Sequence, residues 1–108
     1  MSYWVSLNDG GGNALLVEEH TAGGISAVGG CNRAEINITS NYSAHFDFGL
    51  LQGKRGLETV TILERAVADL GVKIDKDYYK PTKGNVGYVL GILLQWAMIH
   101  PDGVWEVV

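Results

Sequence analysis

The segment from about Asn85 to about His100 is apolar on almost every side, and this property limits the possible folds more than any other feature. Apart from one tyrosine, one glutamine and two glycines, its residues are nearly all aliphatic or aromatic. A surface helix normally has a single apolar stripe, so a helix of this composition must be buried on more than one side. At roughly 15 residues it is too short to span a bilayer. We therefore expect a central helix covered by a sheet and a second helix, or a helix whose surface from Val86 to Ile99 also contacts an identical subunit.

Both ends of this segment carry helix-boundary signals. Asn85 is able to cap the N-terminus with its side chain, and Pro101 stops a helix at the residue before it. A first helix is predicted from Leu57 to Leu70, because apolar residues recur there at intervals of three and four. Gly71 follows it as a C-terminal cap.

Glycines in groups of two and three punctuate the first third of the chain. Glycine supplies the positive φ angles that tight hairpins need, so the runs between these groups predict a meander of strands. The expected strands are Tyr3–Leu7, Leu15–Val17, Ile25–Val28, Ala34–Tyr42 and a C-terminal strand, Val104–Val108, that returns to the sheet edge. We expect the apolar residues from Phe46 to Leu51 to reach the core, with a short helix as one way of doing so. Residues 1–108 are thus predicted to form one α+β domain, an antiparallel sheet of about four to five strands packed against two main helices.

The predicted strand at Ala34–Tyr42 carries a row of short hydrogen-bonding side chains, which extends to Ser43 just beyond its end. Because side chains alternate along a strand, this row would share one face while Ile36 and Ile38 face the core. The row consists of Asn37, Thr39, Asn41 and Ser43. Asparagine is a poor strand residue and offers both a donor and an acceptor, which favours a ligand site. The alternatives are a solvated sheet face and hydrogen bonds to neighbouring loops.

A second candidate site precedes the apolar helix. Lys80 and Lys83 lie close to its expected start, where free N–H groups and the helix dipole attract anions. Tyr79 is an aromatic ring that can stack on a base or a sugar, and Asn85 lies beside them. The alternative is that Thr82 or Asn85 only caps the helix and the tyrosines belong to the core. Lys54 and Arg55 form a third, weaker anion candidate.

Charge and residue counts exclude several classes of function. The net charge is −4, and Lys54-Arg55 is the longest basic run, so we expect no binding to duplex nucleic acid. Cys31 is the only cysteine, which rules out an intramolecular disulfide and favours a reducing, cytoplasmic setting without a signal peptide. The three histidines are scattered, so neither a metal site nor a cofactor is expected.

Catalysis has a weak sequence signal. Ser43 or Cys31 would have to lie beside a base, and His45 is near Ser43 in sequence. Residues two apart in a strand point the same way without usually reaching hydrogen-bond distance, so no catalytic residue is assigned.

The chain resembles a family of short, mostly uncharacterised proteins of bacteria and their phages. The resemblance rests on Ala34 to Ser43, with its Asn-x-Thr-x-Asn-x-Ser pattern, on Gly84-Asn-Val-Gly-Tyr88, and on His100-Pro-Asp-Gly-Val-Trp105. It implies a phage or prophage setting and carries no known activity. Together with the residues, it leads us to expect a binding protein for a small polar or nucleotide-like ligand, which would fit the sequestration of a host defence signal.

Two other functions remain open. One is an interaction protein that docks on a host or phage protein through its apolar helix or a sheet edge, and the other is a small enzyme that uses Ser43 and His45. In each case a homo-oligomer is expected, through the apolar helix.

Overall fold

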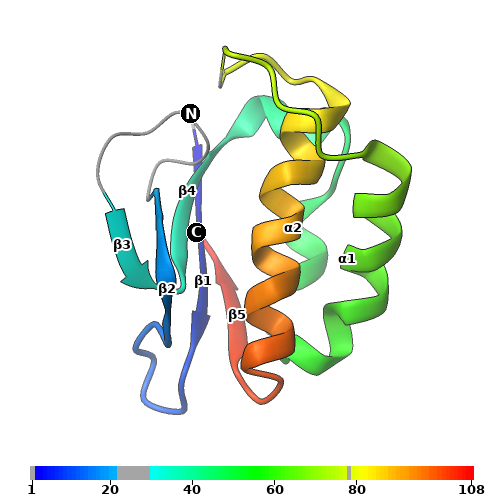
Figure 1. Ribbon diagram of the computed structural model, residues 1–108. Helices are drawn as coiled ribbons and strands as arrows, with labels where there is room; N and C mark the ends of the chain where they lie inside the picture. Colours follow the sequence, from blue (N-terminus) through cyan, green and yellow to red (C-terminus); the bar gives the residue numbers. More distant parts are fainter. Residues whose placement is uncertain (1, 22–29, 78) are drawn as a thin grey trace.

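A computed structural model of the chain describes residues 2–21, 30–77 and 79–108, and Figure 1 shows their arrangement. The fold is α+β, with two α-helices, a three-stranded antiparallel sheet and a two-stranded antiparallel sheet. This confirms the predicted fold class, with the five strands divided between two sheets. The predicted strand at Ile25–Val28 lies outside the described residues.

The three-stranded sheet has β1 (Ser2–Asn8) at its centre, between β4 (Glu35–Thr39) and β5 (Val104–Val107). On one face its side chains are fully buried against the helices, and they include Val5, Leu7, Ile36, Ile38 and Trp105. On the other face Trp4 stands opposite Asn37 and remains half exposed. The alternation of buried and more open residues from Trp4 to Leu7 and along β5 explains why these two strands were predictable from sequence.

The two-stranded sheet consists of β2 (Leu16–Thr21) and β3 (Gly30–Arg33). It joins the first sheet through Leu15, whose N–H donates to the carbonyl oxygen of Leu7 at 2.9 Å. The carbonyl oxygen of Leu15 in turn accepts from Ala34 at 2.7 Å. These bonds place the start of β2 and the end of β3 beside the centre of the main sheet.

The helices are α1 (Gly56–Leu70) and α2 (Lys83–Ile99). Gly71 ends α1 at φ 74°, a backbone conformation that favours glycine, as its predicted capping role requires. The start of α2 differs from the prediction, because Thr82, and not Asn85, is its N-cap. The Thr82 hydroxyl accepts a hydrogen bond from the backbone N–H of Asn85 at 3.1 Å, so the helix begins two residues earlier than expected.

The two helices run antiparallel and approach closely at both ends. Gly56 at the start of α1 lies against Ala97 and His100 at the end of α2, and Gly87 in α2 lies against Gly71. Figure 1 shows α2 between the sheet and α1. Eight residues of α2 are buried, which accounts for its lack of a polar face: Asn85, Val86, Gly87, Val89, Leu90, Leu93, Trp96 and Ala97.

Two short 3₁₀-helices connect β4 to α1, namely η1 (Ser40–Ala44) and η2 (Phe48–Leu51). The second of them agrees with the expected short helix before α1. The first contradicts the predicted strand to Tyr42, since β4 ends at Thr39. The turn fully buries the Tyr42 ring, and the Ser43 hydroxyl stabilises it by donating to the carbonyl oxygen of Ser40 at 2.7 Å.

Candidate functional site

The predicted row of polar side chains does not form a single face. Asn37 lies on the open sheet face, where its amide donates to the Ser2 hydroxyl at 2.9 Å and to the carbonyl oxygen of Tyr3 at 3.3 Å. Thr39 is buried at the end of β4. Asn41 and Ser43 are exposed on the η1 turn. The prediction that these four residues line up is therefore wrong, because the chain leaves the strand after Thr39.

The structure does bring one residue of this row, Asn41, to the second candidate site. The Asn41 amide donates to the carbonyl oxygen of Tyr79 at 3.4 Å, although 38 residues separate them. The ring nitrogen Nε2 of His45 lies 3.0 Å from the carbonyl oxygen of Pro81. The η1 turn and the following His45 thus support the segment before and at the start of α2, of which the structure describes residues 73–77 and 79–83 and which we call the lysine loop.

The buried Asn85 side chain fixes the shape of the lysine loop. Its Oδ1 accepts from the backbone N–H of Asp75 at 2.8 Å, and its Nδ2 donates to the carbonyl oxygens of Asp77 at 3.0 Å and Lys80 at 2.8 Å. An asparagine amide has two donor hydrogens, and both have partners here. Asn85, which is fully buried, therefore lies beneath the loop and organises it.

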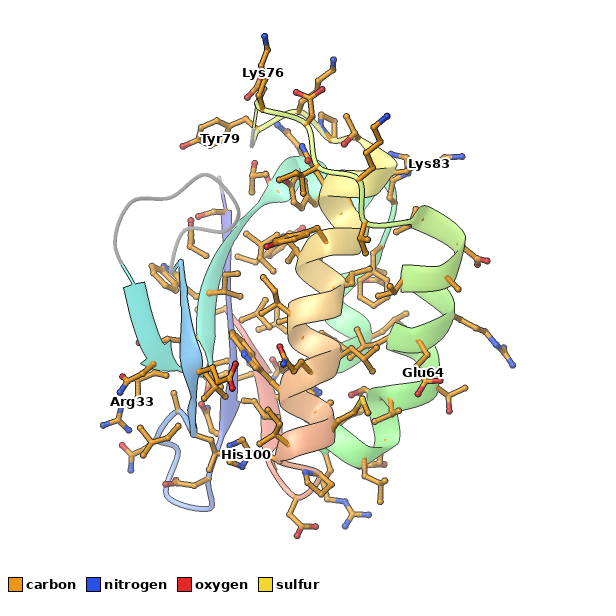
Figure 2. The ribbon with its side chains drawn as sticks, viewed as in Figure 1. Arg33, Glu64, Lys76, Tyr79, Lys83 and His100 are labelled. Atoms are coloured by element: carbon orange, nitrogen blue, oxygen red, sulfur yellow. The ribbon has the colours of Figure 1, made fainter. Side chains whose placement is uncertain are left out.

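The lysine loop concentrates positive charge. Four of the eight Lys and Arg residues of the chain lie in it, and only two of the twelve acidic residues, so its net charge is +2 in a chain of −4. The four are Lys73, Lys76, Lys80 and Lys83. All four are exposed, and the Tyr79 ring between them is 67% exposed. In Figure 2 the labelled Lys76, Tyr79 and Lys83 lie at one end of the molecule and His100 lies at the other.

The acidic residues of the loop are engaged in holding it. The Asp75 carboxylate accepts from the backbone N–H of Asp77 at 2.9 Å and lies 3.7 Å from the Lys80 ammonium. The N–H of Asp77, and after it the charges of Lys80 and Lys76, hold the pKa of the Asp75 carboxyl below its ordinary value. The Asp77 carboxylate accepts from the backbone N–H of Tyr79 at 3.1 Å.

The hydroxyl and imidazole considered for catalysis are directed elsewhere. The Ser43 hydroxyl donates within its own turn, and the His45 ring contacts Pro81. In the third anion candidate, Lys54 and Arg55, the Arg55 guanidinium pairs with Glu58 at 3.5 Å. Among the described residues, no group of three His, Cys, Asp or Glu side chains is placed to hold a metal ion. In that same part of the chain, neither helix has the length and apolar character needed to cross a membrane.

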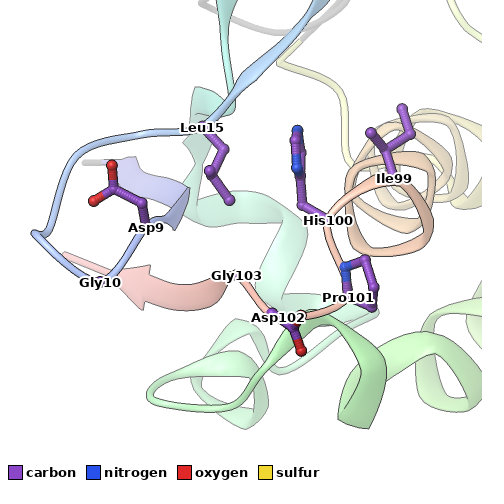
Figure 3. Close-up of a pocket in the computed structure, with 8 residues that line it drawn as sticks. All are labelled: Asp9, Gly10, Leu15, Ile99, His100, Pro101, Asp102 and Gly103. Atoms are coloured by element: carbon purple, nitrogen blue, oxygen red, sulfur yellow. The ribbon is translucent and has the colours of Figure 1, made fainter.

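The described residues form cavities that were not anticipated from the sequence, and two of them lie beside α1 or the end of α2. One, of about 360 Å³, lies at the far end of the molecule from the lysine loop, between Leu15 and the turn after α2 (Figure 3). There the Nε2 atom of His100 contacts the carbonyl oxygen of Leu16 at 2.7 Å, which closes β2 onto the helix end. The other, of about 410 Å³, lies between His45-Phe46 and α1. Each cavity is lined by segments far apart in sequence, so no local sequence pattern predicts it.

Comparison with known protein families, with curated proteins and with solved structures found no match to this chain. A functional assignment therefore has to rest on the geometry of the lysine loop and the η1 turn.

Proposed function

We propose that the protein binds a small anionic ligand of the nucleotide type at the lysine loop and does not convert it chemically. The observation that carries this proposal is an exposed Tyr79 ring held among four lysines on a loop that Asn85 fixes from below. An ammonium attracts a phosphate group as a point charge, and an exposed aromatic ring can stack on any base. The two features together match the two halves of a nucleotide.

The rigid support of the loop favours binding over a purely structural role. Three hydrogen bonds of Asn85 hold backbone atoms of Asp75, Asp77 and Lys80, and one from Asn41 holds the carbonyl oxygen of Tyr79. A loop that is already ordered loses little conformational entropy when a ligand binds. Asn41 stands at the edge of this surface, where its exposed side chain can contact a polar part of the ligand.

The proposed setting follows from the sequence. A single cysteine suits a reducing cytoplasm, and the resemblance to short phage and bacterial proteins suits the sequestration of a nucleotide-like defence signal. Sequestration requires tight binding without turnover, which fits a site built from lysines, a tyrosine and amides.

The test is a thermal-shift titration of the purified protein with nucleoside phosphates, nucleotide sugars and inorganic pyrophosphate at millimolar concentration. A ligand at 100 times its dissociation constant should stabilise the folded state by about 2.7 kcal/mol. Lys83→Gln and Tyr79→Ala should each weaken binding about five- to tenfold, whereas Lys54→Gln, outside the loop, should leave it unchanged. The proposal fails if no compound in the panel raises the unfolding temperature, or if Lys54→Gln weakens binding as much as Lys83→Gln.

A contact with another protein through the open side of α2 is a second candidate. Tyr88, Met98 and Ile99 on that side are 39%, 62% and 49% exposed, which is unusual for large side chains of a central helix. The most direct partner is a second copy of the chain. Native mass spectrometry of the freshly purified protein tests this, since a dimer that Met98→Asp converts to a monomer would support it and a wild-type monomer would refute it.

A further inference from the structure

The cavity between His45-Phe46 and α1 combines an apolar floor with charged groups at its rim. The floor is formed by Phe46, which is 8% exposed, and by the half-buried Ile62, Ala66 and Leu70. The rim carries the His45 imidazole and two exposed side chains of α1, Arg65 and Asp69. A volume of about 410 Å³ lies in the range of small-molecule sites, and an apolar lining with few polar groups is their usual composition.

Arg65 and Asp69 carry opposite charges at the rim of the cavity. They lie four residues apart on α1, a spacing at which opposite charges commonly pair. Among the residues that the structure describes, Arg65 nevertheless forms no ion pair with Asp69 or with any other carboxylate. The rim of the cavity therefore presents one free cation and one free anion, separated by one helical turn.

The His45 ring adds a polar atom of defined character. Its Nε2 atom faces the carbonyl oxygen of Pro81, which only accepts hydrogen bonds, so Nε2 carries a hydrogen. In the neutral ring the other nitrogen, Nδ1, is then an acceptor. An acceptor that lines the same cavity as the Asp69 carboxylate suits a ligand that donates several hydrogens from one group, as an ammonium does.

We infer that this cavity binds a small zwitterion of the apolar amino-acid type. The Arg65 guanidinium receives the carboxylate, the Asp69 carboxylate receives the ammonium, and the apolar side chain rests on Phe46, Ile62 and Leu70. This site uses none of the residues assigned to the lysine loop, so it stands or falls independently of the proposed function.

The experiment is a titration followed by backbone amide NMR shifts, with three compounds that share a phenyl ring and a short linker. L-Phenylalanine carries both charges, 3-phenylpropanoate only the negative one, and 2-phenylethylamine only the positive one. For about a dozen non-hydrogen atoms, a dissociation constant on the order of 1 mM is expected for phenylalanine. Each single-charge compound should bind about fivefold more weakly, because one charged contact is missing.

Single substitutions of Arg65 and Asp69 test the two charged contacts separately. In Arg65→Gln, phenylalanine should bind no better than 2-phenylethylamine, and in Asp69→Asn no better than 3-phenylpropanoate. Glu64→Gln, a neighbouring exposed charge outside the cavity, should keep the wild-type preference (Figure 2). Ala66→Phe should fill the cavity and abolish binding. If that variant does not fold, the two exposed charge variants still decide the matter.

Three results would overturn the inference. They are equal binding of all three compounds to the wild type, an effect of Glu64→Gln as large as that of Arg65→Gln, and no saturation by phenylalanine at about 20 mM.

Discussion

Gly87 and Gly91 lie one turn apart in α2, and we predict that the same change to alanine has opposite effects at the two positions. Alanine is favoured over glycine inside a helix by about 1 kcal/mol. At Gly91 an added Cβ would have no heavy atom within 4 Å. Gly91→Ala should therefore raise the free energy of unfolding by about 1 kcal/mol, with no opposing cost.

At Gly87 an added Cβ would overlap the carbonyl oxygen of Gly71 and lie 3.2 Å from the Cβ of Leu70. Neither is the end of a flexible side chain, so α1 and α2 would have to move apart. Overpacking usually costs about 1–3 kcal/mol, and contact with the backbone belongs at the upper end of that range. After the gain of about 1 kcal/mol from helix propensity, Gly87→Ala should lose about 2 kcal/mol.

The two variants should thus differ by about 3 kcal/mol in unfolding free energy. With a denaturant dependence of about 1.2 kcal/mol per molar urea, their unfolding midpoints should differ by about 2.5 M. The fluorescence of Trp96 and Trp105, both buried, reports the transition. The reasoning is refuted if Gly87→Ala is as stable as the wild type, because the helices then cannot approach at this glycine as described.

Three further predictions concern buried hydrogen bonds and carboxylates. Thr59→Val should lower the free energy of unfolding in urea by about 1–3 kcal/mol. The reason is that the Thr59 hydroxyl accepts a hydrogen bond from the Trp105 indole at 2.8 Å and donates one to the carbonyl oxygen of Gly56 at 2.9 Å. Thr59→Ser, which keeps the hydroxyl, should lose less. Asn85→Ala should lose about 2–4 kcal/mol and speed amide hydrogen exchange at Asp75, and unchanged exchange there would contradict the role of Asn85 under the loop. The backbone N–H of Arg55, with the Arg55 charge, holds the pKa of Glu58 below its ordinary value of 4.5. Its stabilisation is therefore present above pH 4.5 and is lost as the pH falls through the lowered value, so Glu58→Gln should flatten the pH dependence of the unfolding midpoint in acid. A variant with the same acid dependence as the wild type would exclude Glu58 as its source.

Local patterns predicted the helices and the central strands. The apolar spacing from Leu57 to Leu70, followed by Gly71, identified α1 within one residue, since both signals act within a few residues of the chain. The alternation of Val5 and Leu7 with polar neighbours identified β1 in the same way. Such elements are determined by interactions that the sequence contains locally.

The end of β4 and the candidate site depend on tertiary contacts instead. Alternation predicted a strand through Tyr42, but burial of the Tyr42 ring in a 3₁₀ turn prevailed over the strand pattern. The hydrogen bond from Asn41 to Tyr79 spans 38 residues, and no window along the sequence contains both. The prediction did select residues from both sides of this contact, because asparagines in an expected strand and lysines at a helix start were each unusual on their own.

The hydrogen bonds of Asn85 determine which positions of the lysine loop tolerate amino-acid substitution. All three of them reach main-chain atoms of the lysine loop, at Asp75, Asp77 and Lys80. Every residue type except proline presents the same main-chain groups, so these bonds hold the loop whatever side chains it displays. Position 76, where the exposed Lys76 side chain takes no part in these bonds, is therefore a display position on a constant frame. Substitution there should alter which ligands the protein recognises at little cost to its stability, and the same frame offers a place to graft new recognition residues.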